Sequence, residues 1–239
     1  MNNGKAVEQA RGFARAIGDY WQGQLEERLL GLYCLGSLAH GGFSARYSDI
    51  DVGLIATDGL TPAQIEAMRQ HAAKISPELA PRLSLFWSDR GFTIGRFPPL
   101  DRLDYLDHAL PLIERERVAP ARPSRDDVRA YLRGQPLNSW REQVARITAL
   151  TELDDTMRKR LLRALLYPAR FVYSWHTGRM ASNDEAVAFL HNQPQLGIEL
   201  DLVDRALACR NANRPPDELF GERGKLPDML AACAKIAEA

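Results

Sequence analysis

Two aspartates, Asp49 and Asp51, lie one residue apart at the start of the apolar run of residues 50–55. In a β-strand alternate side chains point to the same face, so the two carboxylates would project together, about 7 Å apart along the strand. Such a pair repels unless a cation or a proton lies between its members, and an unpaired aspartate is costly to bury. Mg²⁺ is the usual cation, held by one or two carboxylates and by substrate phosphates. The pair therefore predicts a metal site with Asp49 and Asp51 as ligands.

A second polar group, Gly36 and Ser37, ends another apolar run, residues 30–36. A glycine at a strand end lets a ligand come close to the backbone, and the serine offers a hydroxyl and a backbone N–H. The pair could hold phosphate oxygens, or it could form an ordinary tight turn. Ser48, which directly precedes the aspartates, is a further candidate for binding the same ligand.

These side chains must be positioned by a folded protein, and composition bounds its class. The 239 residues are 45% apolar and 26% charged, as in a soluble globular protein of one large or two small domains. The formal net charge of zero gives no attraction to nucleic acid or to an anionic membrane. Three cysteines without paired spacing argue against a disulfide framework or a zinc site. With neither a signal sequence nor an apolar run of spanning length, the sequence predicts a cytoplasmic protein.

The spacing of apolar residues predicts the elements of the first half. Residues 5–27 read as an amphipathic helix, and residues 30–36 and 50–55 as strands. Thr61 is a predicted N-cap, because proline and then glutamine follow it in the order typical of a helix start. Residues 83–87 form a third predicted strand. The expected order is helix, strand, turn, strand, helix and strand.

A leucine stripe predicts one more helix before the end of this half. The polar residues beside it fall mostly on the other side of that helix, where we expect a solvated face. The Pro-rich residues 118–123 are the best linker in the chain, so we expect domains at residues 1–117 and 124–239. The stripe is Leu100, Leu103, Leu106 and Leu110, and the polar residues are Asp101, Asp104, Asp107 and His108.

The arrangement of Gly36-Ser37 and Asp49-x-Asp51 on neighbouring strands, with a further strand downstream, resembles the nucleotidyltransferase superfamily. Within it, the chain looks most like the minimal nucleotidyltransferases and the aminoglycoside adenylyltransferases of the streptomycin/spectinomycin type. The resemblance implies that Gly36 and Ser37 hold the nucleotide triphosphate and that Asp49 and Asp51 bind Mg²⁺. It also implies in-line attack by a substrate hydroxyl on the α-phosphorus of ATP, with release of pyrophosphate.

One position departs from the family pattern. The family has a third carboxylate on the next strand, where this chain has Ser84. Serine is neither a base nor a strong Mg²⁺ ligand. Asp89 or a more distant acid could substitute, catalysis could be weaker or assisted by the substrate, or the domain could bind nucleotide without turning it over.

The second half of the sequence is helical throughout. Helices are expected over residues 124–134, 140–150, 154–176, 199–211 and 228–239, with another starting near residue 181. Pro168 should kink the third of these helices. One face of that helix could bind the triphosphate across a cleft between the domains, or it could be a solvated basic face. This face comprises Arg160, Arg163, Tyr167 and Arg170.

Residues 166–189 resemble the C-terminal helical domain of the streptomycin/spectinomycin-type adenylyltransferases. The resemblance makes Asp184 and Glu185 candidates for contacting a cationic substrate or the nucleotide. A tryptophan expected on the preceding helix is replaced by Val172, with Trp175 one turn away as a substitute. Ser182 and Glu185 also match a capping box, which would explain the glutamate without any ligand.

The sequence thus predicts an α+β protein, with a nucleotidyltransferase-fold domain of small mixed sheet followed by an α-helical bundle. The first functional hypothesis is Mg²⁺-dependent transfer of AMP from ATP to a hydroxyl of a small molecule, such as an aminoglycoside. The second is a nucleotide-binding or regulatory protein that kept the fold and lost the third acid. Transfer of AMP to a protein hydroxyl is a third hypothesis that the sequence leaves open.

Overall fold

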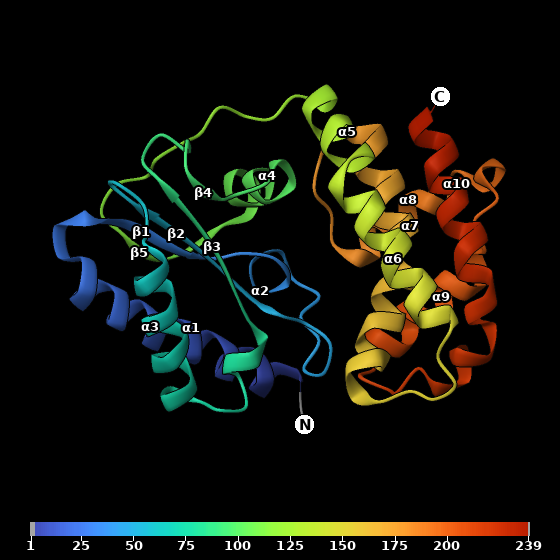
Figure 1. Ribbon diagram of the computed structural model, residues 1–239, viewed down its shortest axis with the longest axis horizontal. Helices are drawn as coiled ribbons and strands as arrows, with labels where there is room; N and C mark the ends of the chain where they lie inside the picture. Colours follow the sequence, from blue (N-terminus) through green and yellow to red (C-terminus); the bar gives the residue numbers. More distant parts are fainter. Residues whose placement is uncertain (1–2, 239) are drawn as a thin grey trace. The chain divides into compact units, whose positions relative to one another are not determined.

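The computed structural model describes residues 3–238, and the chain divides into two compact units, Met1–Arg122 and Pro123–Ala239 (Figure 1). The first unit combines helices with one sheet. Its elements are α1 (Asn3–Leu25), η1 (Glu26–Arg28), β1 (Leu29–Cys34), α2 (Ser37–His40), β2 (Ile50–Ala56), α3 (Pro62–Ile75), η2 (Ala80–Arg82), β3 (Leu83–Asp89), β4 (Gly95–Arg96), α4 (Pro99–His108) and β5 (Leu110–Glu114).

The five strands form one mixed sheet in the order β4-β3-β2-β1-β5, which confirms the predicted small mixed sheet. β2 lies in the middle, antiparallel to β1 and parallel to β3, while β1–β5 and β3–β4 are antiparallel pairs. The parallel pairing of β2 and β3 places Ser84 beside Asp51. Helix α3 joins these two strands, and it begins with the predicted capping box of Thr61 and Gln64.

The side chains of the sheet alternate between two cores. Val52 and Leu54 of β2 belong to a core with Ile17 and Trp21 of α1, and α3 covers the same side. The opposite face carries an aromatic core that includes Tyr105 of α4. Figure 1 shows α1 and α3 on one side of the sheet and α4 on the other. Ile50 and Val52 both face the α1 side, so the side chain of Asp51, which lies between them, is on the α4 side.

Two parts of this unit differ from the sequence-based expectation. The predicted helical stripe is wrong at Leu110, which begins strand β5 and pairs with Cys34. Pro111 explains the change, because proline disfavours helical backbone in the residue before it and is tolerated on an edge strand such as β5. Helix α2 is a single turn, too short to have a hydrophobic period.

The second unit is helical among the residues that the structure describes. Helix α7 runs through its centre and contacts the other helices, and its residues are buried almost without interruption from Leu161 to Ala169. Asp154 caps its first turn, and Gly178 ends it in a left-handed conformation (φ 67°). The elements are α5 (Arg125–Arg133), α6 (Gln135–Thr148), α7 (Asp155–Thr177), α8 (Asn183–His191), η3 (Pro194–Leu196), α9 (Leu200–Asn211), η4 (Asp217–Lys225) and α10 (Leu226–Glu238).

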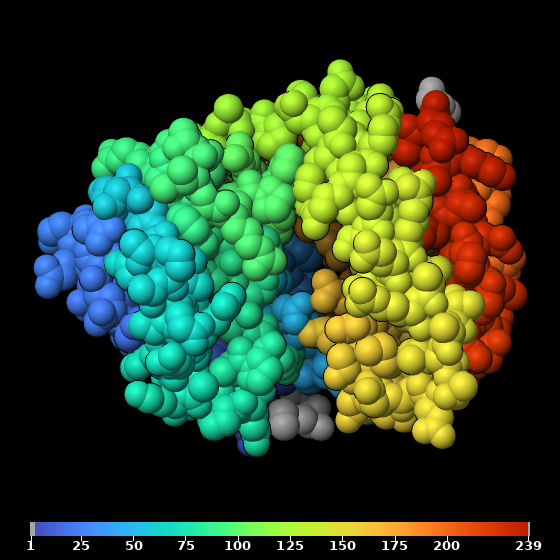
Figure 2. All heavy atoms as spheres, viewed as in Figure 1, coloured from blue at the N-terminus to red at the C-terminus, as the bar shows by residue number. Residues whose placement is uncertain are grey.

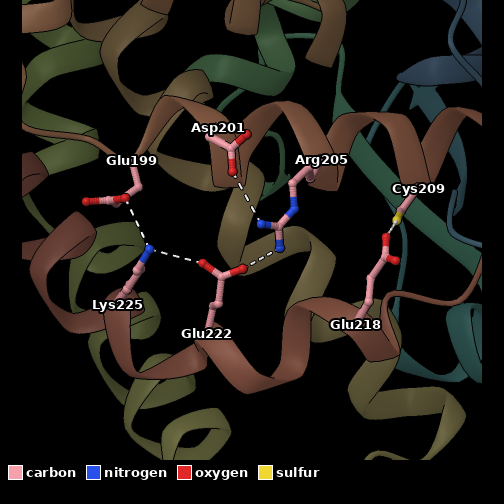
Figure 3. A network of polar contacts seen from close by, with 7 residues as sticks. All are labelled: Glu199, Asp201, Arg205, Cys209, Glu218, Glu222 and Lys225. Carbon is pink, nitrogen blue, oxygen red and sulfur yellow. Dashed lines mark hydrogen bonds and ion pairs between the residues drawn. The ribbon is translucent and has the colours of Figure 1, made fainter.

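A chain of ion pairs fastens η4 to α9 (Figure 3). Glu222 of η4 pairs with both Arg205 and Lys225, and the Lys225 Nζ lies 3.3 Å from Glu199 Oε2. The Cys209 thiol donates to Glu218 Oε1 over 3.6 Å at the far end of the same interface. Within the described residues, no helix is long and apolar enough to cross a membrane.

Candidate active site

Gly36 is in direct contact with Asp51. Its φ of 58° and ψ of −147° are values that a side chain disfavours, and a Cβ added there would lie 3.1 Å from the Asp51 Cγ and closer still to its Oδ2. The Leu35 N–H donates to the Asp51 carbonyl over 2.9 Å, which ties the end of β1 to the start of β2. After Gly36 the chain turns back into α2, whose Ala39 N–H donates to the Gly36 carbonyl. The predicted glycine and aspartate are thus packed together.

The two predicted metal ligands occupy different backbone positions. Asp51 is the second residue of β2, whereas Asp49 directly precedes the strand, and both are half-buried. Asp51 and Ser84 are Cα partners in the parallel pair. Their side chains lie on the same face of the sheet, because Phe86, two residues after Ser84, belongs to the α4-side core. The register therefore confirms that Ser84 stands beside Asp51.

The structure also brings together the two candidate serines. Ser37 Oγ donates to Ser48 Oγ over 3.0 Å, and the Ser44 N–H donates to the same oxygen over 2.9 Å. Ser48 is buried, and Ser37 opens helix α2. The loop of residues 43–49 is thereby joined to the Gly36-Ser37 turn.

Arg82 holds this loop from the other side of β2. Its guanidinium donates to the carbonyls of Ser48 (2.6 and 3.0 Å) and Ala45 (2.9 Å), and it lies over the Phe43 ring. Burial lowers the pKa of Arg82, and the negative charge of Asp49 opposes this shift, so the two charges are close enough to interact. Arg82 thus fixes the backbone that leads into Asp49.

Replacing Arg82 with methionine is expected to destabilise the protein by about 2–4 kcal/mol, because loop carbonyls lose their charged donor. Arg90→Met is the matched control, since Arg90 pairs with Glu116 at the surface and its side chain is 53% exposed. The control should cost at most about 1 kcal/mol. Denaturant unfolding measures both changes. Equal effects of the two substitutions would contradict this role of Arg82.

Asp104 was expected on a solvated helix face, and that expectation is wrong. The residue is 3% exposed, and its Oδ2 accepts a hydrogen bond of 2.6 Å from the Gly36 N–H. Its Oδ1 lies 3.8 Å from Nε2 of His40. The Gly36 hydrogen bond offsets part of the cost of burying this carboxylate, whereas its Oδ1 makes no hydrogen bond to the described residues.

Asp89, one candidate replacement for the missing acid, has a different task. It pairs with Ala56 at the other end of the β2–β3 ladder, about 17 Å from the Asp51–Ser84 pair by strand rise. Its carboxylate accepts from the N–H groups of Thr93 and Ile94 over 2.7 and 3.0 Å. Desolvation of the carboxylate raises its pKa, but these hydrogen bonds outweigh that effect and hold the pKa of Asp89 at about 2. Asp89 therefore organises the β3–β4 turn.

The candidate substrate residues of the second unit have structural partners. Asp184 accepts from Asn211 Nδ2 over 2.8 Å, and Glu185 forms the expected capping box with Ser182. Trp175 is 5% exposed and stacks on Phe171, with guanidinium groups from α5 over its ring. Packing thus accounts for the position of the Trp175 ring.

A cluster of arginines lies beside Asp184. Arg210 of α9 is only 8% exposed, and this burial lowers its pKa. The positive charges of Arg170 and Arg163 lower the pKa further, whereas the negative charge of Asp184 raises it. Tyr167, expected on the same helix face as these arginines, is buried; burial raises its pKa, and the positive charge of Arg170 opposes that shift. No motif in the sequence marks Arg210, because it lies on a different helix from the predicted arginine face.

Two further observations bound the site. Among residues 3–238, no group of three or more His, Cys, Asp or Glu side chains is placed to hold a metal ion. A groove of about 530 Å³ lies between α3 and β3, lined by apolar residues such as Met68, Leu85 and Trp87, and it contains none of the predicted site residues. Figure 2 shows α3 (cyan) beside the residues that follow it in the chain and form the other wall of this groove, residues 77–96 (green).

Comparison with known proteins yields a structural match. No family model matches the sequence, and no curated protein matches it. The crystal structure of the spectinomycin adenyltransferase AAD(9) from Enterococcus faecialis with ATP and spectinomycin is similar, with a TM-score of 0.70 and 13% sequence identity. The match covers 95% of this chain and 98% of that chain. The chain therefore has the fold of an adenyltransferase.

Proposed function

We propose that this protein is a Mg²⁺-dependent nucleotidyltransferase that moves AMP from ATP to a hydroxyl of a small molecule of the aminoglycoside class. The contact between Gly36 and the Asp51 carboxylate carries the proposal. It sets a glycine turn beside a carboxylate at the start of two parallel strands, in a chain with an adenyltransferase fold. A phosphate chain can approach the backbone of such a turn, with the cation it needs held alongside.

The residues present fit a Mg²⁺ ion that the nucleotide brings with it. Asp49 and Asp51 are half-buried and separated by one residue, and they supply two carboxylates. Because Mg²⁺ is usually bound by one or two carboxylates plus substrate phosphates and water, a third protein acid is not required for binding. When bound, the ion would neutralise negative charge on the phosphates.

The roles in the proposed reaction follow from these positions. Ser37 would bind the triphosphate through its backbone N–H, Gly36 would let the phosphates come close to the turn, and Ser48 would hold the Ser37 hydroxyl in place. The acceptor oxygen forms a bond to the α-phosphorus while the bond to the bridging oxygen of pyrophosphate breaks. Ser84 cannot take the hydroxyl proton as a carboxylate would, so in this proposal the proton passes to a phosphate oxygen of the nucleotide.

Charged side chains of the helical unit are further candidates for binding substrate. We propose that Arg170, together with Arg210, binds phosphate oxygens, since two nearby guanidinium groups favour a polyanion. Asp184 and Glu185 would contact a cationic acceptor. Trp175 would support them through packing. The cysteines Cys34, Cys209 and Cys233 are free and buried.

The proposal is tested with ATP labelled at its α-phosphorus, Mg²⁺ and a panel of aminoglycosides and aminocyclitols. Label is expected to move to a small acceptor, with mass spectrometry locating one added AMP. Label that moves instead to protein would support the protein-hydroxyl hypothesis and contradict the small-molecule acceptor.

Ser84 favours a second candidate function, nucleotide binding without turnover. Substituting Ser84→Asp places a carboxylate beside Asp51 and is expected to raise kcat by about 100-fold, a typical contribution of a general base. Ser84→Asn is the uncharged control and should give no increase. Turnover that appears only in Ser84→Asp would establish the binding protein as the natural function. An unchanged kcat in Ser84→Asp would contradict the place given to this residue.

A further inference from the structure

We propose that Asp104 is a positioning residue for the phosphate-binding turn, a role that rests on the proposed function. Asp104 lies 68 residues after Gly36 in the chain, and its Oδ2 accepts the Gly36 N–H over 2.6 Å. A carboxylate is among the strongest acceptors for a backbone N–H. This one acts on the residue that contacts Asp51.

The bond is made to a backbone that needs support. Gly36 has a φ of 58° and a ψ of −147°, outside the regions that other residues favour. Glycine can adopt this conformation without steric cost, but it loses more backbone entropy on folding than any other residue. The Asp104 carboxylate therefore selects one conformation of the turn from those that glycine permits.

Asp104 is held in turn by its surroundings. His40 of α2 approaches its Oδ1 to 3.8 Å, and the His40 ring lies 5.5 Å from the His108 ring in an edge-to-face arrangement. His108 is on α4, one turn after Asp104. The cluster thus connects both ends of the turn, Gly36 and His40, to a single helix.

Burial restricts what this carboxylate can do. At 3% exposure, with Oδ2 committed to Gly36, Asp104 cannot reach the hydroxyl proton of an acceptor. The Gly36 N–H is committed too, so nucleotide phosphates would contact the turn beyond it, at Ser37. Asp104 therefore affects the reaction by fixing the backbone, and its effect should fall on nucleotide binding.

The test compares Asp104→Ala and Asp104→Asn with Asp107→Asn, an exposed position on the same helix. In Asp104→Ala we expect the KM for MgATP to rise by about 10- to 100-fold, as for outer-shell partners of ligands. The value of kcat should change far less, because the lost interaction stabilises the bound nucleotide equally in the ground state and in the transition state. Asp104→Asn keeps an acceptor oxygen and should restore most of the affinity. Asp107→Asn should behave as wild type.

The NMR signal of the Gly36 amide in the free protein provides a readout independent of catalysis. Its proton should move upfield in Asp104→Asn, because a neutral oxygen is the weaker acceptor, and exchange with solvent should accelerate in Asp104→Ala. If these changes in the Gly36 signal occur in a protein that shows no turnover, they would contradict the proposed function but support the role of Asp104 in fixing the Gly36 turn. An unchanged Gly36 amide, or an unchanged KM in a catalytically active Asp104→Ala, would overturn the inference.

Discussion

Replacing Asp51 with asparagine is expected to lower the rate of AMP transfer by about 100- to 1000-fold, the scale seen when one charge-stabilising group is removed from an active site. Asparagine has the shape of aspartate but no negative charge, so it holds a divalent cation poorly. Asp51 lies at the start of β2 with its carboxylate against Gly36. The loss should appear in kcat/KM measured at saturating Mg²⁺, while the free energy of unfolding stays close to wild type.

Asp58→Asn provides the control for this substitution. Asp58 follows the same strand and pairs with Arg28 over 2.6 Å at the surface. Removing its charge should leave transfer intact, because the effect of an exposed pair on the protein is small. A similar loss of activity in both variants would show that general electrostatics, and not the position of Asp51, governs the rate.

Gly36→Ala is expected to abolish measurable transfer and to destabilise the protein by at least about 1–3 kcal/mol, the cost of holding a residue in a sparsely populated backbone region. The added Cβ would lie 3.1 Å from the Asp51 Cγ, so either the carboxylate or the turn must move. The activity should fall by more than the loss of folded protein explains. Thermal unfolding and kcat/KM, measured on the same sample, separate the two effects.

Gly197→Ala separates backbone strain from displacement of Asp51. Gly197 also has a left-handed conformation (φ 70°), but an added Cβ there meets nothing within 4 Å. This variant should show a modest loss of stability with normal transfer. If Gly36→Ala is as active as Gly197→Ala, the contact between Gly36 and Asp51 is not part of the catalytic site.

The parts of the fold that follow a local period could be predicted from the sequence. Short apolar runs bounded by turn residues identified β1, β2 and β3, and the Thr61 capping signal identified the start of α3. Strand β5 was missed because its Leu110 continues the period of the preceding helix, and only Pro111 indicates the change. A single-turn helix such as α2 has no period to detect.

The same distinction applies to the candidate site. Gly36, Ser37 and Asp51 lie at strand ends, so spacing alone brings them near one another. Arg82 and Asp104 act through contacts across 34 and 68 residues of chain, and no local pattern specifies these. Asp104 also lies between Leu103 and Tyr105, which are both fully buried, so the buried part of α4 is wider than the leucine stripe.

Pyrophosphate release tests the central claim most directly. Wild-type protein is mixed with ATP and Mg²⁺, with and without each member of an aminoglycoside panel, and Asp51→Asn is assayed in parallel. We predict that release requires Mg²⁺ and at least one acceptor, and that the substitution removes it. Tight ATP binding by the wild type with no release on any acceptor would contradict the assignment as a small-molecule nucleotidyltransferase.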